Sequence, residues 1–175
     1  ILFTLEALDF PPSFRKLIEK CLTSTHFSVA INGESCGYFK GTRGLRQGDP
    51  LSPYLFVLAL EVFSQLLIKK YVDGSVGFHP QTKDLQVTHL SFADDLMIFS
   101  DCSVNSIKCI ADTLEDFALW SGLRMNKFKT ELFAAGLNTD ETIDISRLGF
   151  NLGSLPIRYL GLPLMYRKLR ISDYR

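Results

Sequence analysis

The sequence predicts an α+β fold in which packed helices cover an antiparallel sheet. Two hairpin signals support this class: Asn32-Gly33 separates two strand-like runs, and Asp94-Asp95 lies between two short apolar runs. The third observation is a helical repeat, because apolar residues recur at intervals of three and four over residues 104–118. The predicted order is helix, hairpin, long helix, hairpin, helix and strand.

The N-terminal part of the chain predicts two helices and the first hairpin. Residues 1–8 are typical of the end of a helix, and a Pro-Pro-Ser start signal precedes a second predicted helix over residues 14–22. Strands are expected over residues 26–31 and 36–40. They flank the Asn-Gly pair, which favours a tight hairpin loop.

The middle of the chain predicts a long helix and the second hairpin. Proline is tolerated in a first helical turn, so Pro50 and Pro53 indicate a helix that runs to about Tyr71. Strands are expected over residues 87–93 and 96–99. Their apolar and aromatic composition is typical of buried strands.

The C-terminal part gives weaker signals. Gly122 is placed to end the helix that begins near residue 104. A strand is expected over residues 128–134, and a short one over residues 158–164, broken by Gly161 and Pro163. Residues 138–154 show no clear pattern.

The composition indicates an ordered, electrically neutral domain. The chain has 175 residues, of which 46% are apolar, and its 19 basic side chains balance 19 acidic ones. This length suits about one domain, and the apolar fraction excludes disorder. Neutrality argues against a free-standing nucleic-acid-binding protein, which is usually basic. Because the sequence starts without methionine and stops in a basic stretch, we expect it to be cut at both ends.

The four cysteines and the most apolar stretch favour an intracellular protein without a membrane span. No two cysteines form a C-x-x-C pair, so we expect buried thiols in a reducing compartment rather than zinc ligands. No signal peptide is recognised, so secretion is not expected. Residues 51–68 include Glu61, Ser64 and Gln65, which favour a core helix over a membrane-spanning one.

The adjacent aspartates Asp94 and Asp95 are the most informative feature for function. We expect a hairpin turn that holds both carboxylates at its tip. Two unit charges about 4 Å apart repel by roughly 4 kcal/mol at an effective dielectric near 20, so the pair needs a proton or a cation. Mg²⁺ binds through one or two carboxylates together with substrate phosphates. The alternative is a solvated turn, in which aspartate is common.

The glycine-rich loop over residues 41–53 is the second informative feature. Its glycines allow a ligand to approach the backbone, and Arg43 and Arg46 offer planar donors for phosphate. Gln47 could hydrogen-bond a sugar or a base edge, and the following helix presents free amides to an anion. The alternative is a loop that simply starts a helix, with solvated arginines.

Four motifs in this chain resemble, in the same order, those of reverse transcriptases, specifically those of LINE-type retrotransposons without long terminal repeats. The first, RQGDPLSPYLF, opens the long helix at residue 46, and the second is FADD at residues 92–95. The third is GLRMNKFKTE at residues 122–131, and the fourth is YLGLPL at residues 159–164. The resemblance implies the palm subdomain of a right-hand polymerase, that is, an RNA-directed DNA polymerase.

The resemblance also implies catalytic roles. Asp94 and Asp95 would coordinate two Mg²⁺ ions, with Mn²⁺ as a substitute, for nucleotidyl transfer to a primer hydroxyl. Lys129 would contact the triphosphate or protonate pyrophosphate. A solvated lysine at the end of a strand explains Lys129 about as well.

Substrate-binding roles follow from the same motifs. Arg46, Gln47 and Gly48 would border the incoming deoxynucleotide and the template base. Phe92 and Ala93 would form the floor of that pocket. A primer grip would consist of Tyr159, Leu160 and Gly161, although a plain core strand explains the first two nearly as well.

One departure from the family concerns the metal site. Residues 7–14 match the family stretch A-L-x-F-P-x-x-F, and the family's further metal-binding aspartate lies on a strand before that stretch. Asp9 is no substitute, because no strand pattern surrounds it. We therefore expect residues 1–175 to be a partial reverse transcriptase domain, with the upstream fingers, the first aspartate strand and the thumb absent.

The implied partners are an RNA template, a DNA primer and deoxynucleoside triphosphates, together with the missing fingers and thumb of a parent polyprotein. The implied location is the cytoplasm and nucleus, within a retroelement ribonucleoprotein. Two other hypotheses stay open. One is a degenerate, non-catalytic retroelement remnant, and the other is a small α+β nucleic-acid-binding module.

Overall fold

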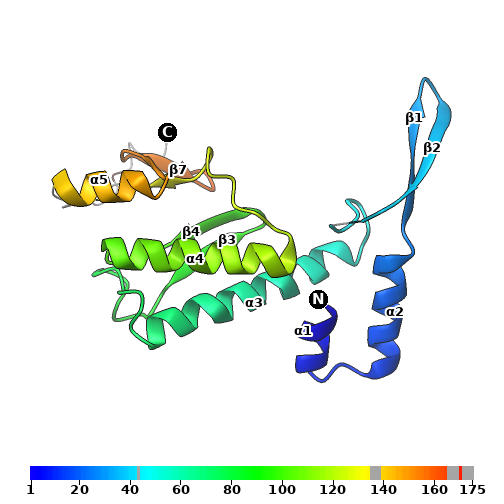
Figure 1. The fold of residues 1–175 in the computed structure, drawn as a ribbon, viewed down its shortest axis with the longest axis horizontal. Coiled ribbons are helices and arrows are strands. Elements are labelled where there is room, and N and C mark those ends of the chain that lie inside the picture. The colour runs from blue at the N-terminus through cyan, green and yellow to red at the C-terminus, as the bar shows by residue number, and fades with distance from the viewer. Residues whose placement is uncertain (43, 135–138, 165–169, 171–175) are drawn as a thin grey trace. The chain divides into compact units, whose positions relative to one another are not determined.

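A computed structural model describes residues 1–42, 44–134, 139–164 and 170. It contains helices and short strands in the order shown in Figure 1, which confirms the α+β class. The chain divides into two compact units. The first comprises Ile1–Lys69 and Thr113–Arg124, and the second comprises Lys70–Asp112 and Met125–Arg175. Each unit is described by itself below.

The first unit begins with two helices, α1 (Leu2–Ala7) and α2 (Pro12–Thr23). Both helices were predicted, but α2 starts two residues earlier than expected because Pro12 occupies its first turn, where no amide donor is needed. Leu5 and Ile18 pack with Leu55 into a buried cluster. This apolar cluster stabilises the pair of helices.

The hairpin of the first unit joins β1 (His26–Ile31) to β2 (Glu34–Lys40). Ile31 pairs with Glu34, so Asn32 and Gly33 form a two-residue loop, as predicted. The second strand begins two residues earlier than expected, directly after this loop. Every residue of β2 is exposed, so local pairing rather than burial holds this hairpin together within the described chain.

Two long helices contribute residues to both units, α3 (Ser52–Val72) and α4 (Val104–Ser121). Both agree with the predicted helices. In the first unit the rings of Phe63 and Phe117 lie 5.3 Å apart, and both side chains are buried. Among the described residues, no helix is both long enough and apolar enough to cross a membrane.

The second unit contains the Asp-Asp hairpin, β3 (His89–Phe92) and β4 (Asp95–Ile98). The pairing was predicted, but the expectation of buried strands is wrong. Leu90 is 47% exposed and Phe92 is 61% exposed, because no described part of the chain covers the distal half of the hairpin.

The C-terminal part of the second unit differs most from the prediction. The strand expected over residues 128–134 is reduced to β5 (Glu131–Leu132), which pairs in parallel with β6 (Asn151–Leu152). The turn before β5 explains the difference, since Asn126 accepts the amides of the three residues that follow Lys127. Helix α5 (Thr139–Arg147) lies where no pattern was recognised.

The last two strands, β7 (Ile157–Tyr159) and β8 (Leu162–Leu164), form a hairpin instead of one broken strand. Leu160 and Gly161 both have positive φ, so they reverse the chain. In the described residues the strands form four separate two-stranded sheets, not the single antiparallel sheet expected. Each antiparallel pair joins strands that are neighbours in the sequence.

The cysteines also depart from expectation. Cys21 and Cys36 are exposed, while Cys102 and Cys109 are half-buried. The predicted buried thiols are therefore wrong for the first two. Burial, with a smaller contribution from Asp101 and then Glu141, raises the pKa of the Cys102 thiol above its ordinary value.

Candidate functional site

The tip of the β3–β4 hairpin carries the two aspartates. Phe92 pairs with Asp95, so the connecting loop has only two residues, Ala93 and Asp94. Asp94 therefore lies in the loop, and Asp95 is the first residue of β4. The predicted hairpin tip is confirmed, but its loop lies one residue earlier than the predicted Asp94-Asp95 turn, because Asp95 already pairs with Phe92.

The backbone of this loop is strained at Ala93, whose φ is +49°. A side chain with a Cβ atom disfavours this left-handed region by about 1–2 kcal/mol relative to the usual conformation. Glycine would adopt the same φ without that penalty. Strained residues of this kind concentrate at functional sites, so Ala93 marks the tip as a candidate.

The two carboxylates are exposed to water. At a separation of 4 Å two unit charges in bulk water repel by only about 1 kcal/mol, so the repulsion expected between Asp94 and Asp95 is largely screened. In the parts of the chain that the structure describes, no group of three or more His, Cys, Asp or Glu side chains is placed to hold a metal ion. The pair offers oxygen ligands that suit Mg²⁺, but it forms only part of a coordination shell.

The base of the same hairpin is buried. The hydroxyl of Tyr71 donates to the carbonyl oxygen of Phe99 at 2.6 Å and lies 3.5 Å from that of Thr88. Burial, and secondly the Asp101 carboxylate, raises the pKa of Tyr71 far above its ordinary value, so the hydroxyl keeps its proton. The sequence predicts Tyr71 only as the end of a helix, because no residue pattern indicates the partners of its hydroxyl.

The glycine-rich loop belongs to the first unit and is described separately from the hairpin. Arg43 lies outside the described residues, and Arg46, Gln47 and Gly48 are exposed. Gly48 has a φ of +83°, which only glycine adopts readily, and it lies in the turn that leads to α3.

Two side chains near the start of α3 form hydrogen bonds with the loop backbone. The carboxylate of Asp49 accepts the amide of Leu51 at 2.8 Å, and the hydroxyl of Ser52 donates to the carbonyl of Arg46 at 2.6 Å. These bonds fix the loop and leave the side chains of residues 46 and 47 in water. No role was predicted for Asp49, although an aspartate shortly before a helix is a common signal for a turn of this kind.

Lys129 is exposed on the turn before β5. Its amide donates to the carbonyl of Asn126 at 3.0 Å. Lys129, Asp94 and Asp95 all belong to the described part of the chain. No ion pair joins the Lys129 side chain to either aspartate there. The structure therefore positions the backbone of Lys129 but does not bring its ammonium group to the aspartates.

The predicted primer grip forms the turn of the β7–β8 hairpin. Leu160 has a φ of +51° and is 49% exposed, so an apolar side chain projects from a strained turn. The hydroxyl oxygen of Tyr159 is enclosed and has no hydrogen-bond partner among the described residues.

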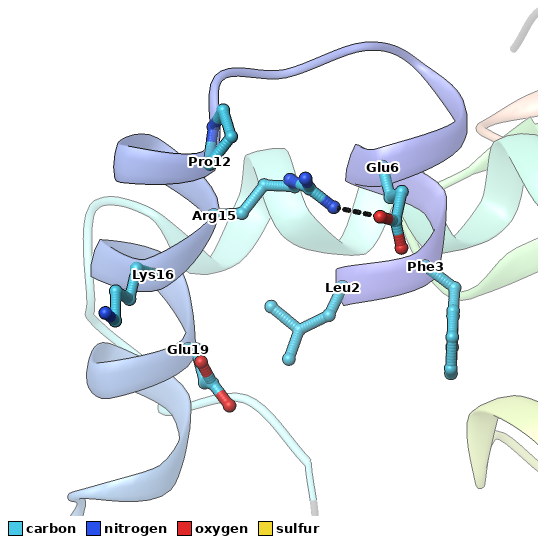
Figure 2. A pocket seen from close by; sticks show the side chains of 7 residues that line it. All are labelled: Leu2, Phe3, Glu6, Pro12, Arg15, Lys16 and Glu19. Atoms are coloured by element: carbon cyan, nitrogen blue, oxygen red, sulfur yellow. Dashed lines mark ion pairs between the residues drawn. The ribbon is translucent and has the colours of Figure 1, made fainter.

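A surface pocket of about 250 Å³ lies between α1 and α2 (Figure 2). Arg15 points across it to Glu6, and their side chains form an ion pair at 2.6 Å. None of the predicted site residues lines this pocket. The lining residues are Leu2, Phe3, Glu6, Pro12, Arg15, Lys16 and Glu19.

Comparison with known proteins identifies the family. Residues 1–164 match the family "Reverse transcriptase (RNA-dependent DNA polymerase)". The chain is 25% identical over 161 residues to a Pol polyprotein from the type-1 retrotransposable element R2 of Popillia japonica, covering 92% of this chain and 26% of that protein. It is 29% identical over 170 residues to a 149 kDa protein of transposon TX1 from Xenopus laevis, covering 97% of this chain and 13% of that protein.

A third relative is a mitochondrial protein of Arabidopsis thaliana, described as uncharacterized. It is 47% identical over 66 residues, which cover 37% of this chain and 54% of that protein. The chain thus spans about half of this relative and about a quarter or less of the two transposon proteins. From the match over residues 1–164 and the retrotransposon relatives, the chain belongs to the reverse transcriptase family, among the LINE-type enzymes of retrotransposons without long terminal repeats.

Proposed function

We propose that this chain is the palm part of an RNA-directed DNA polymerase and that Asp94 and Asp95 are its metal-binding carboxylates. The observation that carries the proposal is the hairpin tip, where Asp94 in the two-residue loop and Asp95 at the start of β4 both expose their carboxylates to solvent. The family match over residues 1–164 supports the reaction class. The retrotransposon relatives support a parent polyprotein much longer than this chain.

The chemistry of the pair suits a hard divalent cation. Two carboxylates supply only oxygen ligands, which favours Mg²⁺, with Mn²⁺ as a substitute. Asp94 and Asp95 would hold such ions, whose chemistry would be to activate a primer hydroxyl and to stabilise a departing pyrophosphate. Asp94 and Asp95 are consecutive residues at the tip of one hairpin, so their carboxylates are neighbours in the chain.

Other residues of the chain bind the substrates in this proposal. Phe92 and Ala93 lie directly beside the aspartates, and both are exposed, so a nucleotide can reach them. The exposed guanidinium of Arg46 suits a phosphate, and Gln47 and Gly48 border the nucleotide and the template base.

The remaining contacts concern the triphosphate and the primer. The ammonium of Lys129 is exposed and available to a triphosphate. The turn formed by Leu160 and Gly161, together with Tyr159, supports the primer end. These assignments rest on the matched motifs and, for Lys129 and Leu160, on the exposure of the side chain.

The site lacks a third carboxylate within the described residues. Two carboxylates alone would supply only part of the ligands that a two-metal site would need. In this proposal the missing ligand, the fingers and the thumb belong to other parts of the parent polyprotein. The complete enzyme takes an RNA template, a DNA primer and deoxynucleoside triphosphates, and it works in the cytoplasm and nucleus as a ribonucleoprotein.

Primer extension on an RNA template tests this proposal. Residues 1–175 alone are expected to add no nucleotide, whereas a polymerase that also contains the upstream and downstream coding regions extends the primer in Mg²⁺. Extension by the 175-residue chain alone would contradict the incomplete metal site. A longer protein that folds and binds the template but adds no nucleotide would favour a degenerate, non-catalytic remnant.

A further inference from the structure

The position of the two aspartates depends on the base of their hairpin. All residues from Leu90 to Leu96 are exposed, so little packing within the described chain holds the tip in place. An isolated two-stranded hairpin is only marginally stable in water. Whatever fixes the direction of the hairpin must therefore act where the strands emerge, near Thr88 and Phe99.

A small rotation at the base of the hairpin produces a large displacement at its tip. Phe92 lies four residues beyond Thr88 along the strand, which is about 13 Å at the rise of an extended chain. A tilt of about 5° at the base would move the tip by about 1 Å, and a displacement of that size can lower a catalytic rate about 100-fold.

Tyr71 contacts the hairpin at this base. Its side chain is buried at the end of α3, and its ring packs on Phe78 with the centroids 4.9 Å apart. A hydroxyl has one proton to donate, and the carbonyl of Thr88 already accepts the amide of Phe99 at 2.9 Å. The short 2.6 Å bond to the carbonyl of Phe99 is therefore the main bond of the Tyr71 hydroxyl.

Neighbouring bonds make the anchor rigid. Phe78 forms a bridge to Ser100, and the amide of Asp101 donates to the carbonyl of Gly77 at 3.0 Å. The amide of Gly77 in turn donates to the buried hydroxyl of Ser106 at 3.0 Å. The segment that leaves the hairpin is thus tied to the segment that follows α3, and Tyr71 joins that network to Phe99, the residue directly after β4.

We propose that Tyr71 is a positioning residue, whose hydroxyl fixes the direction of the hairpin that carries Asp94 and Asp95. This inference rests on the proposed function, because the direction of the hairpin matters only if the aspartates act on a substrate. The hydroxyl touches no substrate. It acts through the Phe99 carbonyl and the strand that leads to the tip.

The variant Tyr71→Phe removes only the hydroxyl, and Tyr38→Phe is a matched control because the Tyr38 side chain is 77% exposed. In the 175-residue chain, hydrogen exchange at the amide of Phe99 is expected to be about tenfold faster in Y71F and unchanged in Y38F. A second variant, Phe78→Leu, keeps the donor but removes the ring contact. It is expected to leave exchange at Phe99 closer to the wild-type rate than Y71F does.

The second part of the test measures steady-state kinetics in the longer polymerase. Y71F is expected to lower kcat about tenfold and to leave KM for the deoxynucleotide within about twofold, because the aspartates are misplaced while nucleotide binding is retained. Y38F is expected to change neither constant. A Y71F enzyme equal to Y38F in both exchange and kcat overturns the proposal, and so does a change in KM alone. If the wild-type polymerase adds no nucleotide, the proposed function fails, and the exchange rates alone decide whether Tyr71 holds the hairpin.

Discussion

The β1–β2 and β3–β4 hairpins have loops of the same length, but they differ in how well the loop residues tolerate the backbone conformation. Each joins its strands through two residues, Asn32-Gly33 in one and Ala93-Asp94 in the other. Asn32 and Gly33 have φ values of +52° and +87°, and both residue types tolerate that region well. Ala93 adopts +49° with a side chain that disfavours it.

This difference separates a loop whose residues suit its backbone from one whose residues do not. Asn-Gly is among the strongest hairpin signals, so the first loop needs no explanation beyond its turn. The second loop accepts strain at alanine, whereas the repulsion between Asp94 and Asp95 is largely screened by water. The strain weakens the hairpin, so we infer that the chemistry at the tip, rather than the stability of the turn, selects the residues there.

The largest expected effect concerns the carboxylates. In a polymerase that contains the upstream region, Asp94→Asn or Asp95→Asn should lower primer extension by more than about 100-fold, since even residues that only support metal ligands contribute 10–100-fold. Glu34→Gln is the matched control, because Glu34 begins β2 at the place that Asp95 takes in β4. Equal losses in both hairpins would remove the distinction between them. Extension rates with saturating substrates measure the effect.

Metal affinity gives the next effect. In the 175-residue chain, two exposed carboxylates without a triphosphate should bind Mg²⁺ or Mn²⁺ no more tightly than about 1 mM, because the hydrated ion keeps most of its waters. Asp95→Asn should abolish this binding in calorimetric titration, and Glu34→Gln should not change it. A micromolar site that disappears in Asp94→Asn would mean that a third ligand lies within the chain.

Replacing glycine by alanine in one loop, and alanine by glycine in the other, tests the comparison through the stability of each hairpin. Gly33→Ala should destabilise β1–β2 by about 0.5–1 kcal/mol, and Ala93→Gly should stabilise β3–β4 by a similar amount, since the left-handed φ disfavours alanine more than flexibility disfavours glycine. An added Cβ atom at Gly33 meets nothing within 4 Å, so the effect is confined to the backbone. Amide exchange within each hairpin measures the change. If Ala93→Gly destabilises its hairpin, the strain assigned to Ala93 is wrong.

The same comparison explains what the sequence could predict. The Asn-Gly loop, the Asp-Asp tip and the two long helices follow from local rules of turn chemistry and periodicity, and all are confirmed. The sequence predicts one short strand over residues 158–164, broken by Gly161 and Pro163, whereas the structure pairs Ile157–Tyr159 with Leu162–Leu164 as a hairpin. The parallel pairing of β5 with β6 joins residues 131 and 151, which no local pattern reveals.

Burial and the hairpin anchor were harder to predict for a different reason. Leu90, Phe92 and Leu96 have the composition of buried strands, yet they are exposed in the described chain. Tyr71 bonds carbonyls 17 and 28 residues away, so its role depends on tertiary structure that a residue pattern does not contain. Sequence motifs identify the residues that act on substrates more readily than those that hold them in place.

The smallest expected effect concerns the third two-residue loop, Leu160-Gly161, which joins β7 to β8. It combines a glycine that suits its φ of +81° with a leucine that does not suit +51°. Leu160→Asn should restore the favoured Asn-Gly loop and stabilise this hairpin by about 0.5 kcal/mol, as measured by amide exchange. Leu162→Asn is the control, because Leu162 is similarly exposed, at 56%, but lies in a strand, where asparagine is disfavoured. The same variant also tests the proposed primer contact. If Leu160 supports a primer, Leu160→Asn should lower primer extension in the longer polymerase. A stabilised hairpin with unchanged extension would assign Leu160 to the turn alone.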